Sequence, residues 1–222
     1  MPPSVRERSM PDLAEAATCV LVRDGSPGPE VLLLRRSRHQ DAFPGAWVFP
    51  GGQIDPADRA GPGGAARRAA VRETHEETGI VLEERDLAPW SCWHPPAEAP
   101  RRFRTWFFAA VAPPSQHVRV DGRESVEHAW MTPRDALARY ARRSLLLLPP
   151  TLITLRDVGR FPTSGHVLRA ARARRPETFH SRIEHSERGP FLLVTAESGT
   201  IRRVSIGPAR HEDVHATHDH HP

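Results

Sequence analysis

Three glutamates in one short segment carry the strongest chemical signal in the sequence. Glu73, Glu76 and Glu77 stand three and four residues apart, so a helix would place their carboxylates on one face. Such crowding is unfavourable unless a cation neutralises it. Mg²⁺ prefers carboxylate oxygens and completes its coordination with water and substrate phosphate, so the spacing indicates a metal site for phosphate chemistry. Three glutamates alone are more often a solvated acidic surface, and the neighbouring residues must decide between the two.

The helix that would carry these carboxylates is clearly marked. Residues 65–78 favour or tolerate helix almost throughout, and Gly79 stands where a C-cap glycine belongs. Ala66, Ala69 and Ala70 lie on or beside the acidic face, where small side chains would leave room for a bulky anion. We therefore expect a helix whose acidic face can receive a phosphate group.

This helix and the loop before it resemble the Nudix box, in which a glycine, a glutamate, an Arg-Glu pair, a Glu-Glu pair and a final glycine recur at fixed spacing. The residues that match are Gly52, Arg72, Glu73, Glu76, Glu77, Gly79 and Ile80. Two positions depart from the pattern. Asp58 occupies the place of the first glutamate, with six more residues than usual between it and Arg72, and Thr74 replaces an apolar residue. The match favours an enzyme over a solvated acidic surface.

The resemblance implies a role for each box residue. The implied metal ligands, for Mg²⁺ or Mn²⁺, are Glu73, Glu76, Glu77 and the carbonyl of Gly52. Arg72 would orient a box glutamate through a charge-assisted hydrogen bond. The implied reaction is in-line attack of water on a diphosphate phosphorus, with the metal polarising phosphoryl oxygens and lowering the pKa of bound water.

The general base is left open among three glutamates. Glu73 is one candidate within the box. Glu124 and Glu127 come just before and at the start of a strand expected near residues 128–131, and either could approach the site from across the sheet. We take Glu73, Arg72 and Glu127 as the catalytic set, with Glu124 as the alternative.

The long form of the loop, residues 49–58, looks like a Nudix subgroup that includes relatives of mammalian coenzyme A diphosphatases. Residues 101–108 and 148–151 look like later elements of that subgroup, and the resemblance covers residues 14–161. It implies a small nucleotide-linked diphosphate substrate, coenzyme A or a related conjugate. An RNA-end pyrophosphohydrolase and a non-catalytic Nudix-fold nucleotide-binding regulator are the alternatives.

Arginines in one later segment are candidates for substrate binding. Arg101, Arg102 and Arg104 could contact phosphates, although an ordinary solvated strand edge is equally compatible with them. Coenzyme A carries an additional 3′-phosphate, and the first two arginines could favour it through charge-assisted contacts.

The rest of the chain predicts an α/β fold. Alternating and apolar runs predict strands at residues 16–22, 31–35, 46–49, 88–93, 103–111 and 128–131, with Pro50 and the glycines after it ending regular structure. Further helices are expected at 133–142, 149–158 and 166–174. The resemblance implies that they form a Nudix-type α/β/α sandwich with a mixed sheet.

Four regions are expected along the chain. A flexible N-terminus of residues 1–13 precedes a Nudix hydrolase domain at 14–161. Residues 162–210 would form a small C-terminal extension containing a hairpin of strands 191–196 and 200–206. Residues 211–222 hold five histidines without apolar periodicity, which predicts a disordered tail.

Composition narrows the partners. The net charge is +4, every basic residue counted with it is arginine, and acidic residues are interleaved with the arginines, so nucleic acid is not an expected partner. No apolar run is long enough to span a membrane, and the N-terminus lacks a secretory signal, so a cytoplasmic location is the default. Cys19 and Cys92 are expected to be reduced and buried. Whether the chain forms a homodimer is left open.

Overall fold

The computed structural model describes residues 13–39, 42–60, 64–99, 101–120, 122, 124–187 and 189–205. The strands are β1 (Ala14–Asp24), β2 (Pro29–Arg36), β3 (Trp47–Val48), β4 (Gly51–Gln53), β5 (Ala88–His94), β6 (Phe103–Val111), β7 (Ser125–Met131), β8 (Glu177–Ser186), β9 (Gly189–Ala196) and β10 (Ile201–Ser205). The helices are α1 (Ala65–Thr78), α2 (Pro133–Ala141), α3 (Pro149–Val158) and α4 (Ser164–Ala173), with short 3-10 turns η1 (Pro56–Arg59) and η2 (Glu84–Asp86).

One mixed sheet connects these strands. Its order is β10-β9-β8-β5-β6-β1-β2-β3, with β4 paired to β1 and β7 paired to β2. The β1–β6 and β5–β8 pairs are parallel, and the other pairs are antiparallel. β1 is the strand that β2, β4 and β6 all share, so the loop containing Gly52 is attached directly to the centre of the fold.

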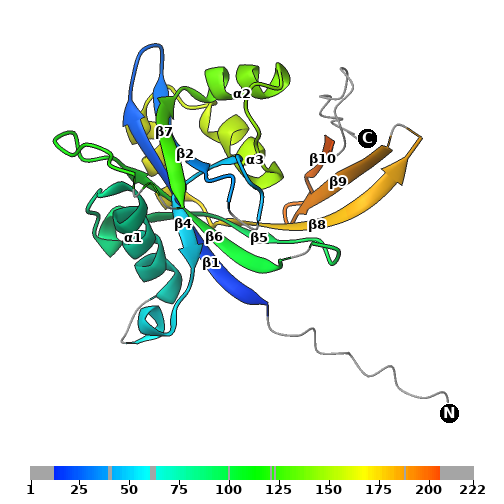
Figure 1. Ribbon diagram of the computed structural model, residues 1–222, viewed down its shortest axis with the longest axis horizontal. Coiled ribbons are helices and arrows are strands. Elements are labelled where there is room, and N and C mark those ends of the chain that lie inside the picture. The colour runs from blue at the N-terminus through cyan, green and yellow to red at the C-terminus, as the bar shows by residue number, and fades with distance from the viewer. Residues whose placement is uncertain are drawn as a thin grey trace.

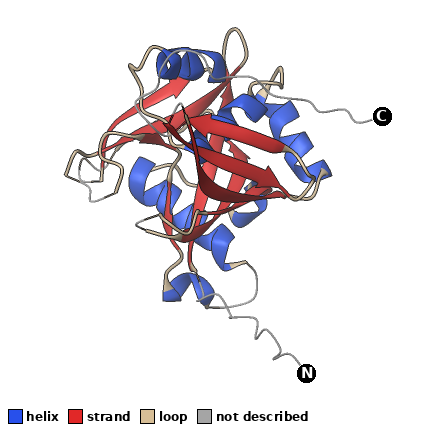
Figure 2. Cartoon of the chain, turned by 90° about the vertical axis from the view of Figure 1, so that its right-hand side faces the viewer, coloured by secondary structure: helices blue, strands red, loops and turns tan. Residues whose placement is uncertain are grey.

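Helices cover both faces of the sheet, because the side chains of β1 alternate between two cores. Ala17, Cys19 and Leu21 pack with α1, whereas Val20 and Val22 pack in the core that contains residues of α2, α3 and α4. Figure 1 shows α1 on one side of β1 and β6, with α2 and α3 on the other, and Figure 2 shows the strands lying between the helices. The expected α/β/α sandwich with a mixed sheet is confirmed.

The C-terminal strands extend this sheet. The hairpin expected at residues 191–206 is present as β9 and β10, but β8 was not predicted from the sequence. Along β8 only Phe179 is buried, so its sequence shows no alternation of apolar and polar residues. Its position is fixed by pairing with β5, where the ring of Phe179 stacks on that of Trp93 with centroids 4.4 Å apart.

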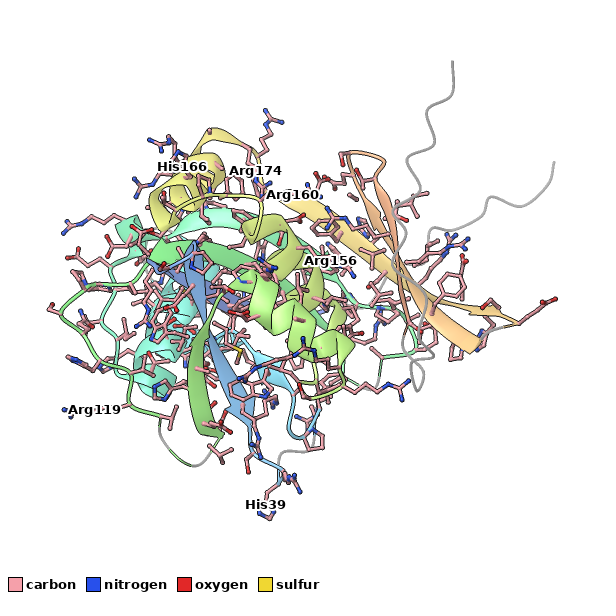
Figure 3. All side chains as sticks on the ribbon, turned by 90° about the horizontal axis from the view of Figure 1, so that it is seen from above. His39, Arg119, Arg156, Arg160, His166 and Arg174 are labelled. Carbon is pink, nitrogen blue, oxygen red and sulfur yellow. The ribbon has the colours of Figure 1, made fainter. Side chains whose placement is uncertain are left out.

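Hydrogen bonds between charged side chains connect β10 to the helical layer. Figure 3 labels Arg156, Arg160 and Arg174 where α3 and α4 face this region. Arg202 of β10 donates two hydrogen bonds, of 3.1 and 3.2 Å, to the carboxylate of Asp157 in α3. These contacts attach β10 to the helical layer rather than leaving the hairpin as a separate unit.

Other expectations about the chain have mixed outcomes. Cys19 and Cys92 are free and buried, as predicted. No helix in the described part of the chain is long and apolar enough to cross a membrane. Residues 1–12 and the histidine-rich segment 211–222 lie outside the described residues, and the four region boundaries remain predictions.

We predict that Phe179→Ala destabilises the whole protein, because Phe179 is only 5% exposed and joins β8 to the main core. A buried Phe→Ala change costs about 3 kcal/mol, which for a chain of this size lowers Tm by roughly 6–12 °C. Ile201→Ala in β10 is the control, because Ile201 is 56% exposed. Equal, small shifts in Tm for both variants would show that the hairpin does not share the cooperative core.

Candidate active site

Two glycines bring the box loop against both the sheet and the helix. The segment Gly51–Gln53 forms β4, where the sequence had predicted an end to regular structure, because β1 offers a free edge at this point. A Cβ on Gly51 would lie 2.4 Å from the Ala17 carbonyl oxygen, so only glycine allows this close pairing. A Cβ on Gly52 would lie 2.3 Å from Oε1 of Glu73. Gly52 therefore places its backbone directly beneath a box carboxylate.

Glu77 is the most deeply buried of the box glutamates. Its side chain is 8% exposed and accepts a hydrogen bond of 2.9 Å from the Gly51 backbone N–H. The pKa of Glu77 is raised to about 8, chiefly by burial, with the charges of Glu73 and Glu124 adding to the rise and the Gly51 hydrogen bond opposing it. A carboxylate in this position is unfavourable unless a cation accompanies it.

Glu73 lies next to it and has a similar environment. Burial raises the pKa of Glu73 above its ordinary value, partly opposed by the hydrogen bond from Arg72 and increased by Glu76 and Glu124. The charge of Glu124 thus acts on both carboxylates, although Glu124 is far from α1 in the sequence.

Arg72 joins the loop to the helix. It donates to Oε1 of Glu73 at 2.8 Å and to Oε2 of Glu76 at 3.0 Å, and its other end donates to the Gln53 carbonyl at 3.0 Å. Its shortest contact with the loop is 2.9 Å, to Oδ2 of Asp58. The hydrogen bond with Asp58 is the largest of the effects that raise the pKa of Arg72.

Asp58 has a positioning role. Its carboxylate is 5% exposed and also accepts a hydrogen bond of 2.9 Å from the Asp55 backbone at the start of η1. Burial raises the pKa of Asp58, but Arg72 and the Asp55 backbone outweigh it, so the net shift is downward. With its oxygens used in this way, Asp58 closes the long loop onto Arg72.

The remaining sequence candidates lie in different surroundings. Glu76 is 55% exposed and bonded to Arg72. Glu127 is 52% exposed and bonded to Arg35 at 2.7 Å. It is not among the charges found to act on Glu73 or Glu77, whereas Glu124 is, although the sequence alone did not separate the two.

The small residues of α1 do not leave space for an anion. Ala69 and Ala70 are fully buried in the core between α1 and the sheet, so the expectation that they border an open face was wrong. The acidic edge of the helix is instead turned toward β4, where Glu73 and Glu77 lie against Gly52 and Gly51.

The donors around Gly52 fit a hard divalent cation. The carboxylates of half-buried Glu73 and buried Glu77 both have raised pKa values, and the backbone of Gly52 lies against Glu73. Carboxylate and carbonyl oxygens are the donors that Mg²⁺ prefers, and this ion commonly takes one or two protein carboxylates and leaves its other positions to water and substrate phosphate. Within the described residues, no group of three acidic, histidine or cysteine side chains is arranged to hold a metal ion.

The three substrate-binding candidates lie elsewhere. Arg104 in β6 is bonded to Glu15 of β1, and both line a cavity together with Arg102. Arg101 is exposed, immediately before Arg102. The structure therefore brings Arg102 and Arg104 together beside β1, whereas the box glutamates lie over β4.

The NUDIX domain model matches residues 12–148 of the chain. The chain belongs to the Nudix family. The match spans the sheet strands β1 to β7, α1 and α2, and therefore all of the box residues described above.

A solved Nudix structure shares this fold. The crystal structure of a NUDIX hydrolase from Alicyclobacillus acidocaldarius is 26% identical, with a TM-score of 0.65, and the match covers 72% of this chain and 97% of that one.

Named relatives include coenzyme A diphosphatases. The peroxisomal coenzyme A diphosphatase ndx-8 of Caenorhabditis elegans is 42% identical over 30% of this chain and 27% of its own length. The human acyl-coenzyme A diphosphatase NUDT19 is 23% identical over 77% of this chain and 69% of its own. Matches to the first three curated relatives span 54%, 27% and 24% of their lengths.

We predict that Mg²⁺ raises the Tm of the protein, and raises it more at pH 8 than at pH 6. Because the folded-state pKa of Glu77 is raised to about 8, the unfolded chain releases this proton at lower pH than the folded chain does. Without metal, stability therefore falls as pH rises from about 4.5 to 8. Mg²⁺ must displace the proton at pH 6 but not above pH 8, so its stabilising effect grows with pH.

Thermal unfolding of wild type and Glu77→Gln, each with EDTA or Mg²⁺ at both pH values, checks this. The variant keeps the shape of the side chain but not its charge, so its Mg²⁺ response should be smaller and nearly independent of pH. An undiminished response in the variant would place the metal elsewhere.

Proposed function

We propose that this Nudix protein is a Mg²⁺- or Mn²⁺-dependent hydrolase that cleaves the diphosphate bond of a nucleoside-diphosphate-linked small molecule. The observation that carries the proposal is the pair of carboxylates, half-buried Glu73 and buried Glu77, held against the Gly51–Gln53 loop. A buried carboxylate such as that of Glu77 is costly to a stable fold, and this cost is offset where a metal ion and a diphosphate bind.

The metal would be held by Glu73 and Glu77, with Glu76 and the Gly52 carbonyl as further ligands. When bound, it supplies charge stabilisation for the phosphoryl oxygens and a more acidic water. Arg72 keeps Glu73 and Glu76 oriented while its other end holds Asp58 and the loop. That arrangement fixes the carboxylates before substrate binds, which avoids reorganisation during the reaction.

We favour Glu124 over Glu127 as the general base. Glu124 acts electrostatically on both Glu73 and Glu77. Glu127, three residues later, is engaged by Arg35 at the outer edge of β7. A base must come within hydrogen-bond reach of the attacking water, and Glu124 is the one whose charge is felt at the box carboxylates.

Coenzyme A or a related conjugate is the substrate that we favour. The named relatives that are coenzyme A diphosphatases support it, together with the long-loop form of residues 49–58. An RNA-end hydrolase is the second candidate, because the m7GpppN-mRNA hydrolase NUDT17 of Xenopus laevis is 34% identical over 36% of this chain. A panel containing coenzyme A, its dephospho form, ADP-ribose and capped RNA, incubated with Mg²⁺ and analysed for products, separates these classes.

The outcomes of that panel are distinct. Release of adenosine 3′,5′-bisphosphate from coenzyme A supports the favoured substrate. Rapid cleavage of ADP-ribose or capped RNA with no cleavage of coenzyme A would reject it. Binding without cleavage of any member, with either metal, would favour a nucleotide-binding regulator.

We predict that Glu77→Gln lowers kcat/KM about a hundredfold or more, because an amide cannot replace a charged metal ligand. Glu83→Gln is the matched control, since Glu83 is 59% exposed and bonded to Arg85. Steady-state rates at saturating Mg²⁺ and a circular-dichroism melt distinguish lost chemistry from lost folding. Wild-type activity in the Glu77 variant would refute the metal assignment.

We also predict that Glu124→Gln lowers kcat about a hundredfold or more, whereas Glu127→Gln leaves kcat nearly unchanged. The decrease of kcat at low pH should disappear in Glu124→Gln and remain in Glu127→Gln. The reverse pattern would return the role of base to Glu127, and two unaffected variants would leave it with Glu73.

A further inference from the structure

A cavity of about 820 Å³ lies beside the box, between β1, β6 and the C-terminal strand β8. Its basic lining residues are Arg59, Arg102, Arg104, Arg182, His94 and His180. The acidic residues that line it are Glu15 and Glu98. Four guanidinium groups against two carboxylates leave an excess of positive charge before either histidine is protonated.

The cavity begins close to the box loop. Glu15 lies two residues before Ala17, which pairs with Gly52, so the two positions are about 7 Å apart along β1. Glu15 accepts hydrogen bonds from both Arg59 and Arg104, and one carboxylate cannot neutralise two guanidinium groups. The wall nearest the box is therefore rigid and cationic.

Arg102 presents a donor that no group in the described part of the chain uses. Its Nε atom is buried and has no hydrogen-bond partner within the described residues. Buried polar groups nearly always have a partner, so a buried guanidinium N–H with none points to an acceptor from outside the chain. An oxyanion is the acceptor that guanidinium groups bind best.

Two histidines also line the cavity. His94 of β5 and His180 of β8 are opposite each other in the parallel register, with ring centroids 4.5 Å apart and planes 22° apart. Ser181 donates a hydrogen bond of 2.7 Å to the His94 carbonyl, which holds the two strands together here. Burial lowers the pKa of His94, and the charges of His180 and Arg104 lower it further against the opposing effect of Glu197.

We propose that this cavity is a phosphate-binding site in which Arg102 and the His94–His180 pair hold a dianionic phosphate and take up a proton on binding. The C-terminal strand β8 supplies one histidine and Arg182, so the extension beyond the box has a direct part in ligand recognition. The phosphate can come from two sources, a phosphate ester on the substrate or free inorganic phosphate. Binding of a phosphate ester of the substrate rests on the proposed function, whereas binding of free inorganic phosphate does not.

Binding is tested on the full chain in EDTA, so that neither metal nor hydrolysis is needed. Calorimetric titration with inorganic phosphate should show binding that Arg102→Gln weakens about tenfold or more, because a charge-assisted hydrogen bond is lost. Arg85→Gln is the control, since Arg85 is 78% exposed and outside the cavity. No binding to wild type, or equal affinities in the two variants, would overturn the proposal.

Proton uptake is tested with sulfate, which stays fully ionised in the neutral range. The charged groups that line the cavity around the histidine pair are Arg59, Arg102, Arg104, Arg182, Glu15 and Glu98, and the charge of Glu197 also acts on His94. Titrations in two buffers of different ionisation enthalpy should show a proton bound with sulfate, and affinity should fall as pH rises. The double variant His94→Asn, His180→Asn should lose this uptake. Unchanged uptake in that variant would reject the role of the pair.

Kinetics separates the two sources. If the site binds a phosphate ester of the substrate, wild type should have a lower KM for coenzyme A than for its dephospho form, and Arg102→Gln should remove this difference in KM. Equal KM values together with phosphate binding assign the site to free phosphate. A preference for coenzyme A that survives Arg102→Gln would overturn substrate recognition by the cavity. Absence of turnover for both substrates rejects the proposed function without affecting the binding result.

Discussion

The guanidinium of Arg72 is the contact on which the geometry of the box depends. Its hydrogen bonds reach Glu73 and Glu76 on the helix and Asp58 and Gln53 on the loop. Without this cation, crowded carboxylates would repel each other and the loop would lose its attachment to α1. A planar group with five donors in fixed directions can serve both sides at once, which lysine could not do. Asp58 belongs to this arrangement even though the loop before it is long, because η1 carries it back to Arg72.

β1 supports both charged regions of the molecule, the acidic box and the basic cavity. One edge of the strand receives β4, which puts Gly52 under Glu73. The same strand begins with Glu15, which is bonded to Arg59 and Arg104 in the basic cavity. Since β1 is also parallel to β6 and antiparallel to β2, it is held from both sides. A rigid central strand thus fixes the spacing between the acidic box and the cationic cavity.

Local signals in the sequence were sufficient to predict the box helix, its C-cap and most strands, because each of these features depends on residues close together in the chain. The structure confirms Gly79 as a C-cap in the left-handed conformation and Thr132 as the N-cap of α2. The features that were missed depend on distant pairing. β8 has few buried residues and exists because β5 offers it an edge, and β4 exists because β1 does. Likewise, the order of Glu124 and Glu127 along the chain does not reveal which of them acts electrostatically on the box carboxylates, because that depends on the folded structure.

The distribution of charge explains how a modest net charge of +4 is compatible with the proposed anion binding. Glu73, Glu77 and Glu124 gather acidic groups on one side of the box, where the proposed metal ion would neutralise them before an anionic substrate approached. Arg102 and its neighbours concentrate positive charge in a cavity on the other side of the loop. Opposite charges that are kept apart by a rigid strand do not neutralise each other, whereas interleaved surface charges do. A ligand with two separated anionic groups can use both regions, one through a metal ion and the other through guanidinium groups. An extended nucleic acid backbone would instead require a continuous basic surface.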